Sequence, residues 1–249
     1  MENASPIRLF FLPYAGANRY AYKVLENEFP SSIIIHPLEL PGRGMRFTEK
    51  LLTSLDAAVE DIYMQMSPFL QSPYAIFGHS LGAVLGYLVT RKILSYNIHP
   101  PFHLFCSGRS GLWNENPQAW YLLPSVEFWG KISGLGGLPE PLSMNDEIKI
   151  IFEPILRADF EMVQSVEQKK HLMAVPMDIP VTVFLGEDDR ITNEPSSWHK
   201  YTIEAPVLHY FRGGHFFFLE NQRRLVQLIL ETLQETMYKS YQWNDEQPF

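Results

Sequence analysis

The chain has one cysteine and fewer basic than acidic residues, and both shortages limit what it can be. Cys106 stands alone, so no internal disulfide can form, and a reducing compartment such as the cytoplasm is expected. Its 20 Lys and Arg residues against 28 Asp and Glu give a formal net charge of −8. Nucleic-acid binding needs a basic surface that displaces counterions from phosphates, so no nucleic-acid partner is expected.

Long apolar runs are also absent. No run approaches the roughly 18 residues that span a bilayer as a helix, so no membrane partner is expected. Residues 1–6 lack the charged and apolar regions of a signal peptide, which again favours a cytoplasmic location. Of the 249 residues, 46% are hydrophobic and 14% aromatic, enough to bury a large core. We therefore expect one domain over residues 1–249. The sequence leaves the quaternary state open, and a monomer is the working expectation.

Six short segments rich in branched and aromatic residues are typical of strands. They are nearly continuous apolar runs, which indicates a sheet covered by helices on both faces. Helix-length segments with apolar residues every three or four positions alternate with them, so an α/β fold with a mostly parallel sheet is expected. The expected strands are 7–12, 33–38, 74–77, 102–106, 181–185 and 208–211, and the expected helices are 54–70, 84–94 and 220–238.

One long interval breaks this alternation. A gap as long as the one between Cys106 and Val181 should contain structure of its own. Helical periodicity at 125–132, 145–152 and 155–170 predicts a helical lid inserted at about residues 110–175. The polar end of the chain, residues 242–249, is expected to be a flexible tail.

A Gly-His-Ser-Leu-Gly-Ala stretch begins at Gly78, between an expected strand and an expected helix. This is the layout of a nucleophile elbow, in which a sharp turn lifts a serine out of the sheet. A serine hydroxyl is a poor nucleophile at neutral pH and needs a base beside it. A serine that only capped the following helix would not need flanking glycines, so Ser80 is the candidate nucleophile.

Candidate partners for this serine follow two later strands. One strand runs into Glu187, Asp188 and Asp189, and the next leads into Gly213-Gly214-His215. The order serine, acid, histidine is that of the α/β-hydrolase fold. His215 would act as general base, and a carboxylate would hold its tautomer. Spacing alone does not rank the three acids, any of which can instead be a turn or cap residue.

An oxyanion hole for this chemistry needs two backbone N–H groups. One belongs to Leu81, directly after the nucleophile, and the other to the loop after the first strand. Because Pro13 has no N–H, Tyr14 is the expected second donor. A metal site is not expected, because Pro100 and Pro101 prevent the helical turn that would align His99 with His103 and no H-E-x-x-H motif is present.

With these motifs in order, the sequence resembles the type II thioesterases, the stand-alone enzymes that accompany non-ribosomal peptide and polyketide synthases. In that family the acid is the fourth residue of a G-x-x-D turn, which implies Asp189. The family's P-H-A-G-G oxyanion loop is altered here, where Tyr14 and Ala17 replace the histidine and the second glycine. Besides the motifs above, the matching stretches are 11–16, 40–46, 135–137, 156–159 and 213–217.

The resemblance implies hydrolysis of acyl thioesters on the phosphopantetheine arm of carrier proteins, with removal of misprimed or stalled acyl groups. It implies acyl or peptidyl carrier domains as partners and no soluble cofactor. The alternatives are a chain-terminating acyl-carrier thioesterase, a free-ester esterase, and a non-catalytic carrier-binding protein.

Three further groups of residues have open roles. Carrier proteins are generally acidic, so Arg43, Arg46 and Lys50 are expected to form a docking loop. Arg157 and Asp159 are two apart and do not face each other on a helix, so structural and substrate-guiding roles are equally open. The remaining group either packs the lid or lines an acyl channel, and consists of Trp113, Trp120, Tyr121, Phe128 and Trp129.

Overall fold

Six strands form one parallel sheet in the order β2-β1-β3-β4-β5-β6. We describe it from a computed structural model that covers residues 6–112, 119–136, 145–165, 175–192 and 196–245. Each strand overlaps a predicted one, and parallel pairing brings the carboxyl ends of all six to one edge of the sheet. The strands are β1 (Ile7–Leu12), β2 (Ile33–Pro37), β3 (Tyr74–His79), β4 (Leu104–Ser107), β5 (Val181–Gly186) and β6 (Val207–Phe211).

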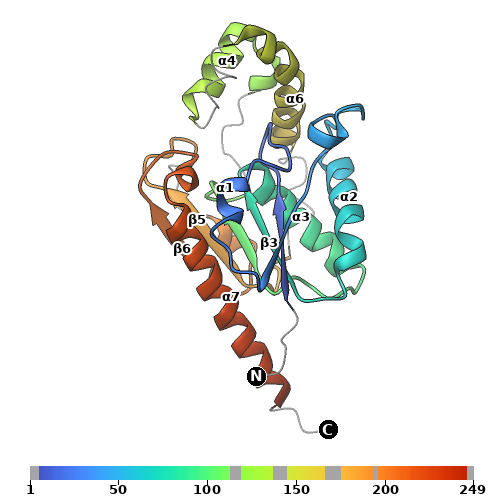
Figure 1. Cartoon of the computed structure of the whole chain (residues 1–249), viewed down its shortest axis with the longest axis vertical. Helices are drawn as coiled ribbons and strands as arrows, with labels where there is room; N and C mark the ends of the chain where they lie inside the picture. The colour runs from blue at the N-terminus through green and yellow to red at the C-terminus, as the bar shows by residue number, and fades with distance from the viewer. Residues whose placement is uncertain (1–5, 113–118, 137–144, 166–174, 193–195, 246–249) are drawn as a thin grey trace.

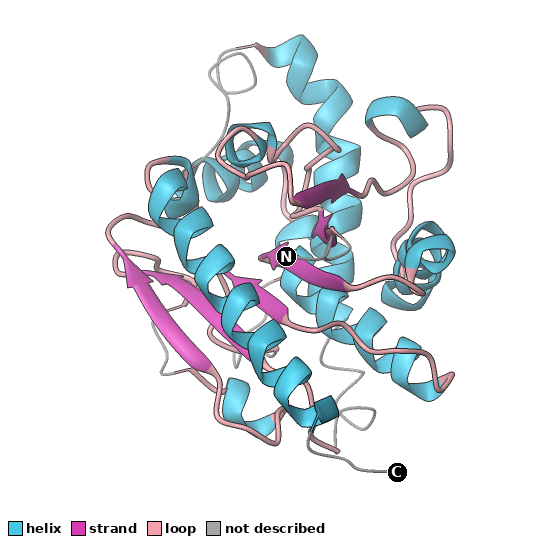
Figure 2. Cartoon of the chain, turned by 60° about the horizontal axis from the view of Figure 1, so that its bottom comes forward, coloured by secondary structure: helices cyan, strands magenta, loops and turns pink. Residues whose placement is uncertain are grey.

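Helices cover both faces of this sheet (Figure 2). Successive strand residues point to opposite faces, so Phe10 and Ile76 pack with α2 (Leu55–Met66) and α3 (Leu81–Ser95). Phe11 and Phe77 pack on the other face with α1 (Lys23–Glu26) and α7 (Gln222–Asp245). The continuous apolar runs are explained by this two-sided burial, and the predicted two-sided α/β architecture is confirmed.

The last helix is longer than predicted. Residues 242–245 belong to α7, so the predicted flexible tail does not begin at 242. Leu225, Ile229 and Leu233 are buried at intervals of four residues, and Met237 packs against the same cluster, so one apolar stripe holds the helix against the sheet. Residues 246–249 lie outside the described part.

In the described part of the chain between β4 and β5, two α-helices lie above the sheet in Figure 1: α4 (Ser125–Gly134) and α6 (Asp146–Ser165). The two helices predicted at 145–152 and 155–170 form the single helix α6, which continues through Pro154. The buried residues of α6 all follow this proline. The bounds of the lid stay a prediction, because 113–118, 137–144 and 166–174 lie outside the described residues.

Three of the five aromatic residues with an open role pack within this region. Phe128 is fully buried in a cluster that α4 and α6 share with the short turn η3 (Trp120–Leu122). Trp120 and Trp129 pack against the same cluster, which favours the lid-packing interpretation over an acyl channel. Trp113 lies outside the described residues.

The buried His103 makes the stability of the fold sensitive to acid. Its ring nitrogens lie 2.8 Å from Thr182 Oγ1 and 3.3 Å from Thr236 Oγ1, and burial lowers its pKa from 6.5 to about 4. The stabilising effect of neutral His103 is therefore complete above pH 6.5 and is lost as the pH falls towards 4. At pH 5 the unfolded chain binds a proton that the folded chain does not, which costs about 2 kcal/mol relative to neutral pH.

The test is urea unfolding of the wild type and His103→Gln at pH 7.5 and pH 5. Carboxylates titrate equally in both proteins, so the difference between their free energies of unfolding isolates His103. We expect this difference to narrow by about 2 kcal/mol at pH 5. A difference that stays constant would show that His103 is not held neutral by burial.

Candidate active site

Ser80 occupies a sharp turn between β3 and α3. Its φ of 54° and ψ of −113° lie where side chains other than glycine are strained. Its N–H donates to the carbonyl oxygen of Ser107 at 2.8 Å, which ties the turn to β4. A Cβ on Gly82 would lie 2.6 Å from the carbonyl oxygen of Leu12, and one on Gly78 would overlap the backbone of Gly82. The flanking glycines are therefore required by close backbone contacts, as in a nucleophile elbow.

The loops that follow β5 and β6 are held together by backbone hydrogen bonds. The N–H of Glu187 donates to the carbonyl oxygen of Phe211 at 2.8 Å, and that of Asp188 to Gly213 at 3.0 Å. This pairing places Asp189 Oδ2 2.8 Å from Nδ1 of His215. Both side chains are buried.

The same turn separates the three consecutive acids. Asp189 Oδ1 accepts the N–H of Ile191 at 2.9 Å, which fixes the orientation of its carboxylate. Glu187 and Asp188 are both exposed. Among the three acids, the structure brings Asp189 to the imidazole, the position that the family resemblance implies.

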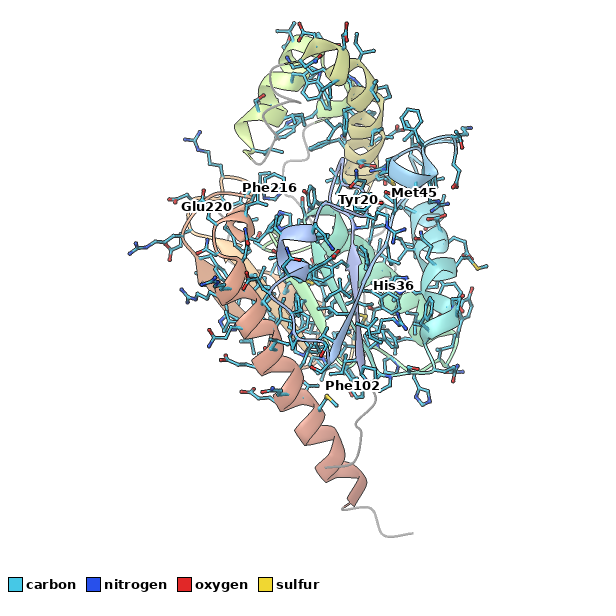
Figure 3. The ribbon with its side chains drawn as sticks, in the orientation of Figure 1. Tyr20, His36, Met45, Phe102, Phe216 and Glu220 are labelled. Atoms are coloured by element: carbon cyan, nitrogen blue, oxygen red, sulfur yellow. The ribbon has the colours of Figure 1, made fainter. Side chains whose placement is uncertain are left out.

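Ser80 and His215 line the same cavity, which has a volume of about 400 Å³. Its other walls come from the loop after β1 and from the apolar sides of α4 and α6, including Ile132, Leu156 and Phe160. Figure 3 shows Phe216, which follows His215 and also lines the cavity, at the end of the body that faces α4 and α6. The nucleophile candidate and the base candidate thus face one apolar chamber between sheet and lid.

The family model described as "Thioesterase domain" matches residues 7–235, which is most of the chain. The chain belongs to the thioesterase family. It is 32% identical to the gramicidin S biosynthesis protein GrsT of Aneurinibacillus migulanus, over 94% of this chain and 91% of that protein.

Solved structures place this thioesterase in the α/β-hydrolase fold that the sequence predicts. ClbQ from the colibactin pathway is 28% identical with a TM-score of 0.85, and covers 94% of this chain and 99% of its own. RedJ, a thioesterase from the prodiginine pathway of Streptomyces coelicolor, is 29% identical with a TM-score of 0.80, over 91% of this chain and 85% of its own.

Of the two predicted oxyanion donors of this thioesterase, Tyr14 lines the cavity, and Leu81 directly follows Ser80, which also lines it. Leu81 is the first residue of α3, where backbone N–H groups have no partner within the helix. Tyr14 lines the cavity, and its ring packs against His79 and Phe216 with centroids 5.8 and 5.2 Å apart. Burial raises the pKa of Tyr14 to about 12, so its hydroxyl stays neutral. The donor roles of both N–H groups stay predictions.

His79 packs directly against His215, the candidate base. This contact was not identified in the sequence analysis. The ring centroid of His79 is 4.8 Å from that of His215, and its Nδ1 lies 2.9 Å from Ser107 Oγ. Burial, followed by the nearby His215, holds the pKa of His79 well below 6.5, so it adds no charge under the base. The available signal was its place before the serine, at the end of a strand that must be buried.

The predicted docking loop of this thioesterase is wrong for Arg43. That side chain is only 3% exposed, and its Nη1 and Nη2 contact Asp159 Oδ2 and Oδ1 at 2.5 and 2.8 Å. Arg46 pairs with the carboxylates of Asp61 and Glu49, which offset its charge. Lys50 is exposed. The cluster of basic residues in the sequence therefore does not form one basic surface.

The two lid residues of open role have different partners. Arg157 pairs with Glu153 on its own helix at 2.7 Å, whereas Asp159 pairs with Arg43 in the loop after β2. Among the described residues no group of three His, Cys, Asp or Glu side chains is arranged to hold a metal ion. Helices in the same part of the chain are too short or too polar to cross a membrane.

Proposed function

We propose that this thioesterase hydrolyses acyl thioesters on the phosphopantetheine arm of carrier proteins and clears misprimed or stalled acyl groups from a non-ribosomal peptide or polyketide synthase. The observation that carries the proposal is a strained serine and an Asp-paired histidine facing one apolar chamber. It is supported by similarity along nearly the whole chain to proteins of gramicidin S and colibactin biosynthesis.

In the proposed mechanism His215 Nε2 takes the proton of Ser80 Oγ as the oxygen attacks the thioester carbonyl. The N–H groups of Leu81 and Tyr14 stabilise the resulting oxyanion. The C–S bond breaks, and His215 returns the proton to the departing pantetheine sulfur. Water then attacks the acyl-serine, again with His215 as base, and releases a free acid. Asp189 holds the imidazole of His215 so that the Nδ1 proton faces the carboxylate. The proposed reaction needs no enzyme-bound cofactor.

We propose acyl or peptidyl carrier domains as partners and a monomer as the working form. Because Arg43 is buried and cannot contact a carrier, the exposed Lys50 and the pocket entrance are the places to look for carrier contacts. A carrier that adds ~1.4 kcal/mol of contact free energy would raise kcat/KM about tenfold over a free thioester of the same acyl group.

The test compares short acyl groups on carriers, the same groups on a small free thiol, and long finished chains on carriers. We expect the short carrier-bound groups to be hydrolysed fastest, with kcat/KM about tenfold above the free thioesters. Preference for long finished chains would instead indicate product release. Equal rates on carrier-bound and free substrates would favour a free-ester esterase, and absence of both hydrolysis and fluorophosphonate labelling would indicate a carrier-binding protein.

A further inference from the structure

One carboxylate joins the lid helix α6 to the two loops that follow β1 and β2. The side chain of Asp159 is fully buried on the domain-facing side of α6. Its Oδ2 accepts the backbone N–H of Gly16 at 2.7 Å, in the loop after β1. Both of its oxygens accept hydrogen bonds from Arg43, in the loop after β2. Asp159 therefore neutralises the charge of Arg43 and also holds the backbone of the loop after β1.

Gly16 is held against α6 from a second side. A Cβ on Gly16 would lie 2.7 Å from Cδ2 of Leu156, one turn before Asp159 on the same helix. The φ of Gly16 is +79°, a conformation that other residues rarely adopt. The helix thus rests directly on the backbone of this loop, and the Asp159 hydrogen bond sets where the loop lies.

The anchored loop carries one of the proposed oxyanion donors. The N–H of Ala17 donates to the carbonyl oxygen of Tyr14 at 2.9 Å and closes a tight turn with Gly16 inside it. A shift of Gly16 would therefore move the Tyr14 N–H. Such donors must lie about 2.7–3.1 Å from the forming oxyanion to stabilise it, so a small displacement removes their effect.

Arg43 holds the carboxylate in place for this task. A buried carboxylate without a cation is costly, and the bidentate guanidinium both offsets its charge and fixes its orientation. Arg43 is presented by a tight loop, because the N–H of Arg46 donates to its carbonyl oxygen at 2.8 Å. The N–H of Met45 donates to Glu39 at 2.8 Å in the same loop.

We propose that Asp159 is a positioning residue that, held by Arg43, fixes the oxyanion loop from the lid helix. The inference rests on the proposed function, because it assigns the Tyr14 N–H to thioester hydrolysis. It makes the second half of α6 a fixed part of the reaction centre. A lid that is displaced from the loop would leave the serine and histidine in place but lower the rate of the chemical step.

The decisive variant is the double replacement Arg43→Met with Asp159→Leu. Exchange of a buried ion pair for apolar side chains of similar size is often neutral for stability, so this protein is expected to fold. It leaves the Gly16 N–H without its acceptor. We expect kcat for a short acyl thioester to fall about 100-fold, as for loss of an oxyanion donor, with KM within about threefold of the wild type. Fluorophosphonate labelling of Ser80 should slow in parallel.

Two single variants complete the design. Asp159→Asn keeps an oxygen that can accept the Gly16 N–H, and is expected to retain kcat within about tenfold of the wild type. Glu153→Gln is the matched control, because Glu153 pairs with Arg157 and Trp129 inside the lid and does not touch the loop. Its kcat should stay within about twofold of the wild type.

Several outcomes would overturn the proposal. A folded double variant with wild-type kcat would make the ion pair purely structural, and a rise in KM alone would indicate substrate binding. An equal loss in Glu153→Gln would assign the effect to lid closure in general. If the double variant does not fold, the single variant Asp159→Asn decides. A folded Asp159→Asn protein whose KM rises while its kcat is unchanged would indicate a role in substrate binding and would overturn the proposal. Failure of the wild type on every thioester would overturn the proposed function instead, while labelling rates would still test Asp159.

Discussion

Replacement of Ser80 by alanine is expected to lower kcat for carrier-bound thioesters roughly a millionfold, because it removes the hydroxyl that attacks the thioester in the proposed mechanism. The fold should not change, since alanine tolerates the turn's φ of 54° no worse than serine does. The Asp189–His215 pair and the chamber would remain, so KM for an acylated carrier should stay within about threefold.

Single-turnover release of a radiolabelled acyl group from its carrier would measure this effect over the required range. A residual rate about 10³–10⁴-fold above that of spontaneous hydrolysis is expected from binding and the oxyanion donors alone. Thermal unfolding and carrier binding of the variant serve as controls for folding. If folded Ser80→Ala kept more than about a hundredth of wild-type turnover, another nucleophile would have to be sought.

The sheet and the elbow could be predicted because their physical causes are local in sequence. A strand covered on both faces must be apolar at nearly every position, as in β3, and the close contacts of the elbow require glycine at Gly78 and Gly82. The choice of Asp189 among three acids was not local. It depends on hydrogen bonds between the loops after β5 and β6, which no spacing within one turn reveals.

The prediction of a docking loop was wrong for Arg43 for a related reason. Arg43 and its partner Asp159 are 116 residues apart, and from sequence alone a buried arginine cannot be told from an exposed one. The continuous helix α6 was missed because Pro154 normally interrupts a helix. Packing of the residues that follow it, such as Leu156 and Met162, against the domain and lid outweighs that local preference.

Replacement of Asp189 by asparagine is expected to lower kcat about 10⁴-fold while keeping the fold. In the wild type Oδ1 accepts the N–H of Ile191, and Oδ2 faces Nδ1 of His215. The oxygen of an asparagine would keep the Ile191 hydrogen bond, and its NH₂ group would then face Nδ1. An N–H donor at this place stabilises the tautomer with its proton on Nε2, which cannot accept the proton of Ser80.

The neighbouring acids provide the matched controls for this variant. Glu187→Gln and Asp188→Asn remove the same charge from exposed positions in the same turn, and each should leave kcat within about threefold of the wild type. The comparison separates a general electrostatic effect of the acidic turn from the hydrogen bond to His215. If Asp188→Asn cost as much as Asp189→Asn, the turn would act through its total charge. If Asp189→Asn kept kcat within about tenfold, the histidine would need no carboxylate to hold its tautomer, and the proposed division of roles would be wrong.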